Sequence, residues 1–454
     1  MMRTALTLLL CAALSIAASV TASLGQEPEP APPATGGDFY PIYVWDHIGQ
    51  WGKDLSDPER LAFQESMFGG MSQCALTMPG FISPEQLPLA EKYGFKTIVQ
   101  YYEDLGEQIK KIGGSDIAKL TDEQADILAR EMTADTKDNP NVLGYYLCDE
   151  PGADQFPGLA RLTAAIKKYA PGKLPYINLF PTYGSTIGAD RGSQLNTHTY
   201  EEYLERYVQE VKPMFLSYDN YMVEYSEDMT IPERADIYWN NLLEVRRVAM
   251  KYHLPWWNIV SSLAILPEST PPTPARLAFQ AYTSLAAGAN ALGWFLYHPC
   301  CGFEFAPVDR HWNRTVVWGY LREVNQQVRT LGTYLKRFRS SDVWFSTPTA
   351  RPNLPENPKT LLSDLKVSFT EQGPKDHQPC VMVGQFEAKE GDGRAVMFVN
   401  LDFANAVKVE PVFLQGEVTL RWISPQDGTV QKMPSHGWRI LPGHGILLTI
   451  EQPR

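Results

Sequence analysis

Eight short runs of apolar, aromatic and β-branched residues alternate with longer helical stretches between Tyr40 and Tyr297. Such alternation implies parallel strands joined by right-handed helical crossovers. Eight units over roughly 300 residues match the usual size of a closed (β/α)8 (TIM) barrel. The runs are YPIYVW (Tyr40 to Trp45), SQCALTM (Ser72 to Met78), KTIVQYY (Lys96 to Tyr102), VLGYYLC (Val142 to Cys148), PYINLF (Pro175 to Phe180), MFLSY (Met214 to Tyr218), WNIVSS (Trp257 to Ser262) and ALGWFLY (Ala291 to Tyr297).

The stretches between these runs carry helix signals. Ser83 is suited to cap the helix of SPEQLPLAEKYG and Gly94 to end it, while Thr121 precedes TDEQADILAREM. An open doubly wound sheet is the alternative to a barrel. The first run leads into YVWDHIGQWG, which lacks the GxGxxG pattern of that fold, so the sequence favours the α/β barrel, over residues 39–340.

The pattern changes after about Ser341. Short runs of alternating apolar residues follow one another without helical stretches, and a tight turn is predicted at Gly391 to Gly393. This pattern predicts a small antiparallel β-sandwich over residues 341–454.

The chain begins with one arginine, an apolar run and then small residues, the layout of a secretory signal peptide over residues 1–25. A membrane anchor is the competing interpretation, but the apolar run is short for one. A Pro-rich spacer at residues 26–38 follows. We therefore expect a secreted or periplasmic protein with no membrane insertion after signal cleavage.

Charge and cysteine spacing narrow the choice of partners. The formal net charge is -12 and no run of Lys or Arg exceeds two residues, which argues against a nucleic acid partner. The cysteines show no CxxC spacing, and His47 and His298 fall on separate strands. We expect no metal and no other cofactor.

In a parallel barrel, reactive side chains come from the carboxyl ends of the strands, which gather at one face. The ends of the predicted strands are rich in carboxylates and aromatic rings, a combination that suits a carbohydrate substrate. The residues expected to bind substrate are Trp45, Asp46, His47, Tyr101, Asn178, Tyr218, Tyr221, Trp294, Tyr297 and His298.

The fourth predicted strand ends in GYYLCDEPG, which places Asp149 beside Glu150. Two neighbouring carboxylates raise each other's pKa, so one of them can stay protonated near neutral pH and act as an acid. Pro151 releases the chain from the sheet because it has no N–H to donate. The structural alternative is a turn whose carboxylates cap the following helix.

This arrangement resembles the (β/α)8 glycoside hydrolases, in which an acid/base glutamate ends strand four and a small β-sandwich often follows the barrel. The resemblance covers roughly Tyr40 to Arg454 and implies that Glu150 is the general acid. In the large clan of retaining enzymes, the residue before that glutamate is usually Asn and a second glutamate ends strand seven. Here WNIVSSLAIL has no carboxylate, and the next one along is Glu268.

Two substitutes for the missing nucleophile remain open. Asp149 and Glu150 look like the Asp-Glu pair of the hexosaminidases that use substrate assistance, in which the Asp orients a 2-acetamido group that attacks the anomeric carbon. Alternatively Asp219, at the end of strand six, is the nucleophile or the base that activates water. A purely structural role for Asp219 is the third possibility.

The sequence therefore predicts an exported glycoside hydrolase with Glu150, Asp149 and Asp219 as catalytic carboxylates. A non-catalytic carbohydrate-binding barrel is the first alternative, because strand seven ends without a carboxylate. A polysaccharide lyase is the second, although such an enzyme would favour acidic uronans, which a chain of charge -12 should bind poorly.

Overall fold

The computed structural model describes most of the chain from Phe39 onward. The predicted signal peptide and spacer, residues 1–38, lie outside the described residues, as does Glu268. No helix in the described part of the chain is long and apolar enough to cross a membrane. The described residues are 39–190, 192–226, 229, 232–265, 269–346, 354–371, 373, 378–416, 418–432 and 438–451.

Eight short strands of the N-terminal part all run parallel to their neighbours. Seven of them overlap the predicted runs. The strands are β1 (Ile42–Val44), β2 (Phe81–Ile82), β3 (Thr97–Val99), β4 (Val142–Asp149), β5 (Leu174–Asn178), β6 (Leu216–Asp219), β7 (Trp256–Ser261) and β8 (Ala291–Phe295).

The prediction of the second strand at Ser72 to Met78 is wrong. Helix α2 continues through Gln73, and the chain then turns at Ala75, which has a positive φ of 59°. The strand itself, β2, lies further along. The apolar run is buried as a helix end and a turn, because a short apolar run alone does not distinguish a strand from a buried helix.

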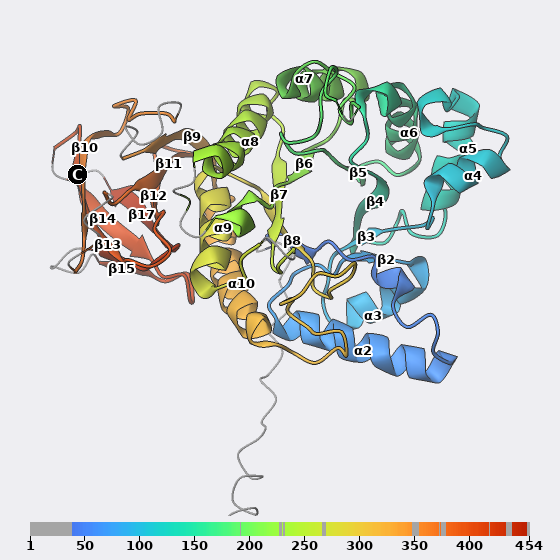
Figure 1. Ribbon diagram of the computed structural model, residues 1–454, viewed down its shortest axis with the longest axis horizontal. Helices are drawn as coiled ribbons and strands as arrows, with labels where there is room; N and C mark the ends of the chain where they lie inside the picture. Colours follow the sequence, from blue (N-terminus) through green and yellow to red (C-terminus); the bar gives the residue numbers. More distant parts are fainter. Residues whose placement is uncertain are drawn as a thin grey trace, which may run out of the picture. The chain divides into compact units, whose positions relative to one another are not determined.

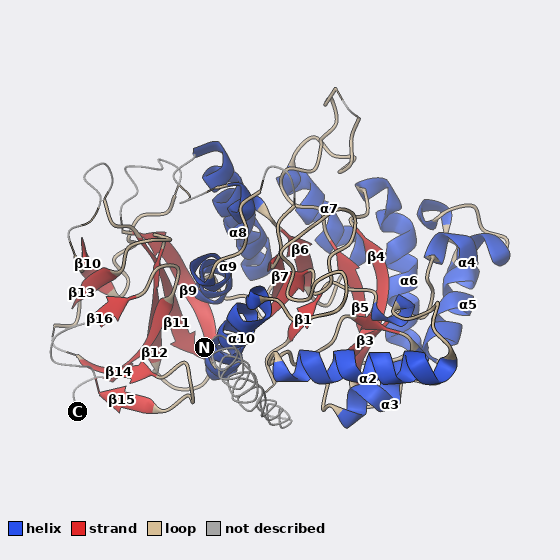
Figure 2. Cartoon of the chain, turned by 60° about the horizontal axis from the view of Figure 1, so that its bottom comes forward, coloured by secondary structure: helices blue, strands red, loops and turns tan. Residues whose placement is uncertain are grey.

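Helices follow the strands and flank them, as Figure 2 shows. Local signals set several of their starts: Thr121 caps α5 in a capping box with Gln124, and the Thr273 hydroxyl accepts from the Arg276 N–H at the start of α9. The helices are α2 (Asp57–Gln73), α3 (Leu87–Lys92), α4 (Leu105–Lys111), α5 (Asp122–Thr133), α6 (Phe156–Tyr169), α7 (Tyr200–Val211), α8 (Pro232–Lys251), α9 (Pro274–Ala286) and α10 (Val316–Leu335).

The eight strands form two four-stranded parallel sheets, ordered β1-β8-β7-β6 and β2-β3-β4-β5. Two bridges join the sheets: His47 pairs with Phe81 beside β1 and β2, and Leu179 pairs with Tyr218 between β5 and β6. Pairing therefore runs from β1 through every strand in sequence order to β8 and back to β1.

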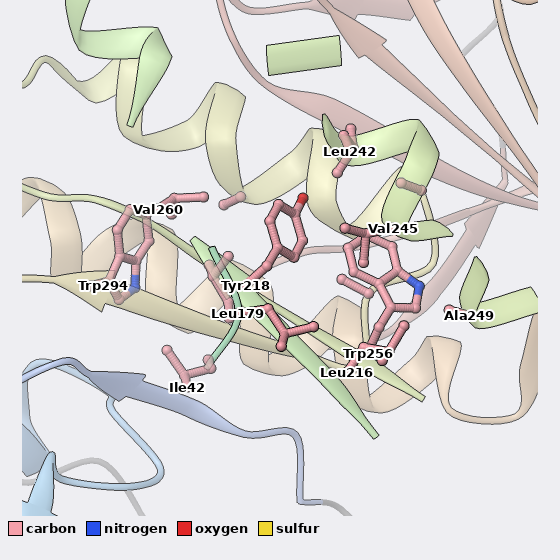
Figure 3. Close-up of a cluster of buried hydrophobic side chains, with 14 of the residues drawn as sticks. Ile42, Leu179, Leu216, Tyr218, Leu242, Val245, Ala249, Trp256, Val260 and Trp294 are labelled. Carbon is pink, nitrogen blue, oxygen red and sulfur yellow. The ribbon is translucent and has the colours of Figure 1, made fainter. Parts of the chain in front are cut away.

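Side chains alternate between the two faces of these strands. Ile42, Leu216 and Trp256 pack toward the helices in one large buried cluster, whereas Tyr43 and Trp257 belong to a second cluster on the opposite, inner face. Figure 3 shows the outward cluster around Tyr218 and Trp294. This alternation decides which residues at the strand ends can reach a substrate.

The strands after α10 form two antiparallel sheets, which Figure 1 shows gathered in the orange and red part of the chain. Their orders are β15-β14-β17-β12-β11-β9 and β10-β13-β16, and both contribute to one buried cluster that includes Trp344 and Trp438. This pattern is consistent with the predicted sandwich. The strands are β9 (Phe338–Phe345), β10 (Leu362–Phe369), β11 (Val381–Ala388), β12 (Arg394–Asn400), β13 (Val407–Phe413), β14 (Thr419–Ile423), β15 (Val430–Lys432), β16 (Trp438–Ile440) and β17 (Gly445–Glu451).

Candidate active site

Three neighbouring strands end in polar residues on the same edge. Asp149 is the last residue of β4, Asn178 of β5 and Asp219 of β6. Asp149 and Asn178 are register partners, and the bridge from Leu179 to Tyr218 holds β6 against β5. Because the strands are parallel, their carboxyl ends meet, and the three side chains come together.

The Asn178 amide joins the two aspartates. Its Nδ2 donates to Asp149 Oδ1 at 3.2 Å and to Asp219 Oδ1 at 2.8 Å. Its Oδ1 accepts from the Ser217 hydroxyl at 2.9 Å, so the amide is held with its N–H groups toward the carboxylates. Asn178 therefore places two carboxylates within reach of one amide group.

Glu150 follows β4 in a left-handed backbone conformation with a φ of 44°. Its N–H donates to the Asn178 carbonyl at 2.9 Å, and its side chain is hydrogen-bonded to Asp219. A positive φ is uncommon for a residue with a side chain and costs about 1–3 kcal/mol, a cost that tends to occur at functional sites. The turn brings the Glu150 carboxyl to that of Asp219.

Glu150 and Asp219 hold a proton near neutral pH. Burial, followed by the charge of Asp149, raises the pKa of Glu150 to about 7, although its hydrogen bond with Asp219 lowers the value. Burial, followed by the charges of Glu150 and Asp149, raises the pKa of Asp219 well above its ordinary value, against hydrogen bonds from Asn178 and Tyr221. A hydrogen-bonded pair of carboxyls that shares a proton can donate it.

Asp149 differs from this pair because part of its side chain is exposed to solvent. Its surroundings still raise its pKa through desolvation, while the hydrogen bond from Asn178 and the nearby His47 lower it. Since the exposed carboxyl keeps contact with water, we expect a smaller shift than at Asp219, which is 3% exposed. Asp149 is the carboxylate most accessible to a ligand.

On the far side of Asp149, His47 pairs with the end of β3. His47 Nδ1 and Gln100 Oε1 lie 2.8 Å apart. Gln100 also lines a cavity of about 790 Å³ formed by the segments that follow β1, β2 and β3. The three carboxylates do not line this cavity, so Gln100 and His47 are the link between the cavity and Asp149.

The cavity offers aromatic and charged groups. Tyr101 and Tyr102 lie edge to face, with ring centroids 5.0 Å apart. The two cations in its lining form ion pairs, Lys53 with Glu103 and Arg60 with Asp57. The lining residues are Gly49, Gln50, Lys53, Asp57, Arg60, Leu61, Gln64, Ser83, Pro84, Glu85, Gln86, Gln100, Tyr101, Tyr102, Glu103 and Asp135.

Two predicted substrate-binding residues point away from this edge. Tyr218 is 1% exposed and packs with Leu242 and Val245 of α8, as Figure 3 shows. Trp294 is fully buried, and its indole Nε1 donates to Asn325 of α10 at 2.8 Å. The expected substrate contacts of Tyr218 and Trp294 are therefore corrected: both side chains join the strands to the helices.

Three further predicted residues hold the segment after β8. The Asp46 carboxylate accepts from the backbone N–H of Tyr297 at 2.7 Å and of His298 at 3.4 Å, and burial raises its pKa to about 7. The Tyr297 hydroxyl accepts from Trp318 at 3.0 Å, and the His298 ring stacks on Trp312. Asp46 is a clamp between β1 and β8, and not a substrate contact.

The remaining predicted residues lie nearer the carboxylates. Tyr221 is hydrogen-bonded to Asp219 and stacks on Phe295 with ring centroids 4.7 Å apart. Trp45 is 6% exposed in the inner cluster, where it contacts His47 and Tyr146. Tyr221 is thus a candidate for a substrate contact, whereas Trp45 supports the floor beneath His47.

The end of β7 carries two serines and no carboxylate. Ser261 Oγ donates to the Leu263 carbonyl at 3.0 Å, and Ser262 Oγ donates to the Leu296 carbonyl at 2.9 Å. Gln280 of α9 donates to the Ser261 carbonyl and accepts from its N–H. Both hydroxyls are engaged in holding backbone.

Sequence reasoning missed Gln100, Ser217 and Tyr183 as parts of this site. Tyr183 follows β5, and the charge of Asp219 contributes to the rise in its pKa, after desolvation. Alternation along β6 would have found Ser217, because it shares the inward face with Asp219. Among the described residues, no group of three His, Cys, Asp or Glu side chains is arranged to hold a metal ion.

No protein-family model and no curated protein matches the sequence. Solved structures do resemble the fold. A glycoside hydrolase family 5 structure from Bacteroides vulgatus is 11% identical, with a TM-score of 0.52 over 91% of this chain and 89% of that one. A β-galactosidase from Marinomonas ef1 is 10% identical, with a TM-score of 0.47 over 65% of this chain and 60% of that one. The first of these likenesses shows that the fold is one that glycoside hydrolases use.

Proposed function

We propose that this protein is an exported glycoside hydrolase in which Glu150 is the general acid. The observation that carries the proposal is the Glu150 carboxyl at the end of β4, with its pKa raised to about 7 and hydrogen-bonded to Asp219. A glycosidic oxygen must receive a proton as its bond to the anomeric carbon breaks, and a carboxyl with this pKa can supply it at neutral pH.

The fold supports this proposal. We infer that the eight strands close into the expected (β/α)8 barrel, because pairing runs around all of them through the bridges His47 to Phe81 and Leu179 to Tyr218. In such barrels the active site lies at the carboxyl ends of the strands, where Asp149, Glu150 and Asp219 are found. Fold alone does not select a reaction, so the site carries the argument.

The contact between Glu150 and Asp219 selects between the two mechanisms open to the chain. Two hydrogen-bonded carboxyls are closer than the roughly 5–5.5 Å of retaining or 6.5–9.5 Å of inverting pairs, so no sugar ring fits between them. Asp219 is thus the partner of Glu150 and not the opposing nucleophile. Asp149, which is exposed, is free to accept a hydrogen bond from a 2-acetamido N–H.

The proposed reaction is therefore substrate-assisted hydrolysis of a 2-acetamido glycoside. The acetamido oxygen attacks the anomeric carbon while Glu150 protonates the leaving oxygen, and Asp149 stabilises the positive charge on the acetamido nitrogen. Glu150, now a carboxylate, takes a proton from the water that attacks the anomeric carbon and restores the acetamido group. We propose that neighbouring sugar units occupy the cavity beside Gln100 and Tyr101.

The test is a panel of aryl glycosides and polysaccharides, with and without 2-acetamido groups, applied to the wild type and to Glu150→Gln. We expect activity confined to 2-acetamido substrates, lost by at least about 10²-fold in the variant, and falling in the wild type as pH rises through about 7. Glu123→Gln, an exposed glutamate on α5, is the matched control and should keep full activity.

Activity on plain hexosides would exclude substrate assistance and make Asp219 the next candidate for the nucleophile. A non-catalytic carbohydrate-binding protein is the second candidate, because β7 ends in Ser261 and Ser262 without a carboxylate. That alternative predicts saturable sugar binding with no product released, by the wild type and Glu150→Gln alike.

A further inference from the structure

A line of buried polar side chains crosses the inner face of the strands to reach the site. Tyr43 of β1 and Tyr176 of β5 have their hydroxyl oxygens 2.6 Å apart. The Tyr176 hydroxyl lies 2.8 Å from Ser217 Oγ of β6, and Ser217 is bonded to Asn178. Tyr43, Tyr176 and Ser217 are each at most 1% exposed. None of them can contact a substrate.

The direction of each hydrogen bond in this line follows from counting protons. Ser217 has one hydroxyl proton, which it donates to Asn178 Oδ1, so it must accept from Tyr176. Tyr176 then accepts from Tyr43. The line therefore runs one way, from Tyr43 to the Asn178 carbonyl, and leaves both amide protons of Asn178 for Asp149 and Asp219.

The surroundings of the line strengthen its effect. Tyr43 and Tyr176 lie in the inner aromatic cluster with Trp45 and Trp257, where hydrogen bonds are not weakened by water. Space for Tyr43 depends on Gly293 of β8, since a Cβ there would lie 2.7 Å from the Tyr43 ring. The chain thus holds the ring of Tyr43 in one place.

We propose that Ser217, Tyr176 and Tyr43 are positioning residues that fix the Asn178 amide and thereby set the pH range over which the carboxyl cluster holds its proton. An amide held by Ser217 presents only N–H groups to the two aspartates, which favours their charged forms. An amide free to rotate presents its oxygen part of the time, which favours the protonated forms. As a statement about catalysis, the inference rests on the proposed function.

The carboxyl cluster also senses other groups, and these remain in place in the variants tested. Charged or titratable side chains that influence Asp149, Glu150 and Asp219, or are influenced by them, come from the strands and segments around the site. They are His47, Tyr146, Cys148, Tyr183, Tyr200, Tyr218 and Tyr221, in addition to Tyr43 and Tyr176.

The test is a titration of the whole protein, labelled with ¹³C in the side-chain carboxyls of Asp and Glu and followed by NMR. Signals are assigned with Asp149→Asn, Asp219→Asn and Glu150→Gln. We expect Ser217→Ala to raise the midpoints of Asp149 and Asp219 by about half to one pH unit. Ser217→Thr keeps the hydroxyl and should restore the wild-type midpoints, and Tyr176→Phe should give a smaller shift in the same direction as Ser217→Ala.

A lowered melting temperature with unchanged midpoints in Ser217→Ala would overturn the proposal and leave a purely structural role. If Ser217→Ala does not fold, Tyr176→Phe and Tyr43→Phe decide the matter in the same way. The titration needs no substrate, so it stands even if the protein hydrolyses nothing. Where hydrolysis is found, Ser217→Ala should move the pH profile of kcat and leave KM nearly unchanged.

Discussion

The ends of β4, β5 and β6 and the end of β7 lie on the same edge of the parallel strands, yet they differ in chemistry. The first three carry Asp149, Asn178 and Asp219, joined by one amide. The end of β7 carries Ser261 and Ser262, whose hydroxyls both bond backbone carbonyls. The comparison teaches that acid chemistry is confined to one side of the site, so the nucleophile has to come from elsewhere.

Replacing Asp219 tests whether that side works as a unit, and we expect the largest effect here. Asp219→Asn keeps the hydrogen bond to Glu150 but removes the carboxyl that shares its proton. Turnover of an active substrate should fall about 10²–10³-fold, measured as kcat under saturating conditions. An unchanged kcat would reduce Asp219 to a structural role.

Replacing Asp149 separates its two effects on the site. Its charge raises the pKa of Glu150, so Asp149→Asn should shift the alkaline fall of activity about one pH unit lower. The variant should also lose activity on 2-acetamido substrates, because the amide bears no charge to stabilise the intermediate. A pH profile that does not move would show that Glu150 is insensitive to its neighbour.

Much of this edge could be predicted from sequence because strand ends and carboxylates are local features. Asp149, Glu150 and Asp219 were expected together, and the structure brings them together. The wrong residues, Tyr218 and Trp294, come from treating every residue at a strand end as inward-facing, whereas side chains alternate. Asp219 faces inward, so Tyr218 cannot.

Other features could not be predicted because they depend on contacts between distant segments. The fixed amide of Asn178 requires the register of β5 against β6, which no local pattern specifies. The second strand was misplaced because the apolar run at Ser72 to Met78 is buried by the end of α2 as well as it would be in a sheet. The short β2 has only two residues to mark it.

The acid side should also reveal itself in the dependence of stability on pH. The folded-state pKa of Glu150 is about 7 against an ordinary 4.5, so the protonated form favours folding and this contribution is lost as pH rises from about 4.5 through 7. Glu150→Gln removes the titration. The loss in unfolding free energy between pH 5 and pH 8 should be smaller in the variant by about 1–2 kcal/mol, measured by urea denaturation.

The end of β7 should give the smallest effect. Ser261 Oγ donates to the Leu263 carbonyl, so Ser261→Ala leaves that carbonyl without this partner and costs stability by about 1 kcal/mol. Because the hydroxyl has no base beside it, kcat should change less than about threefold, a small effect next to the loss expected from removing an activated nucleophile. A loss of 10²-fold or more would make Ser261 part of the chemistry and would end the contrast between the two sides of the site. A loss confined to stability would keep catalysis with the carboxylates of β4 and β6.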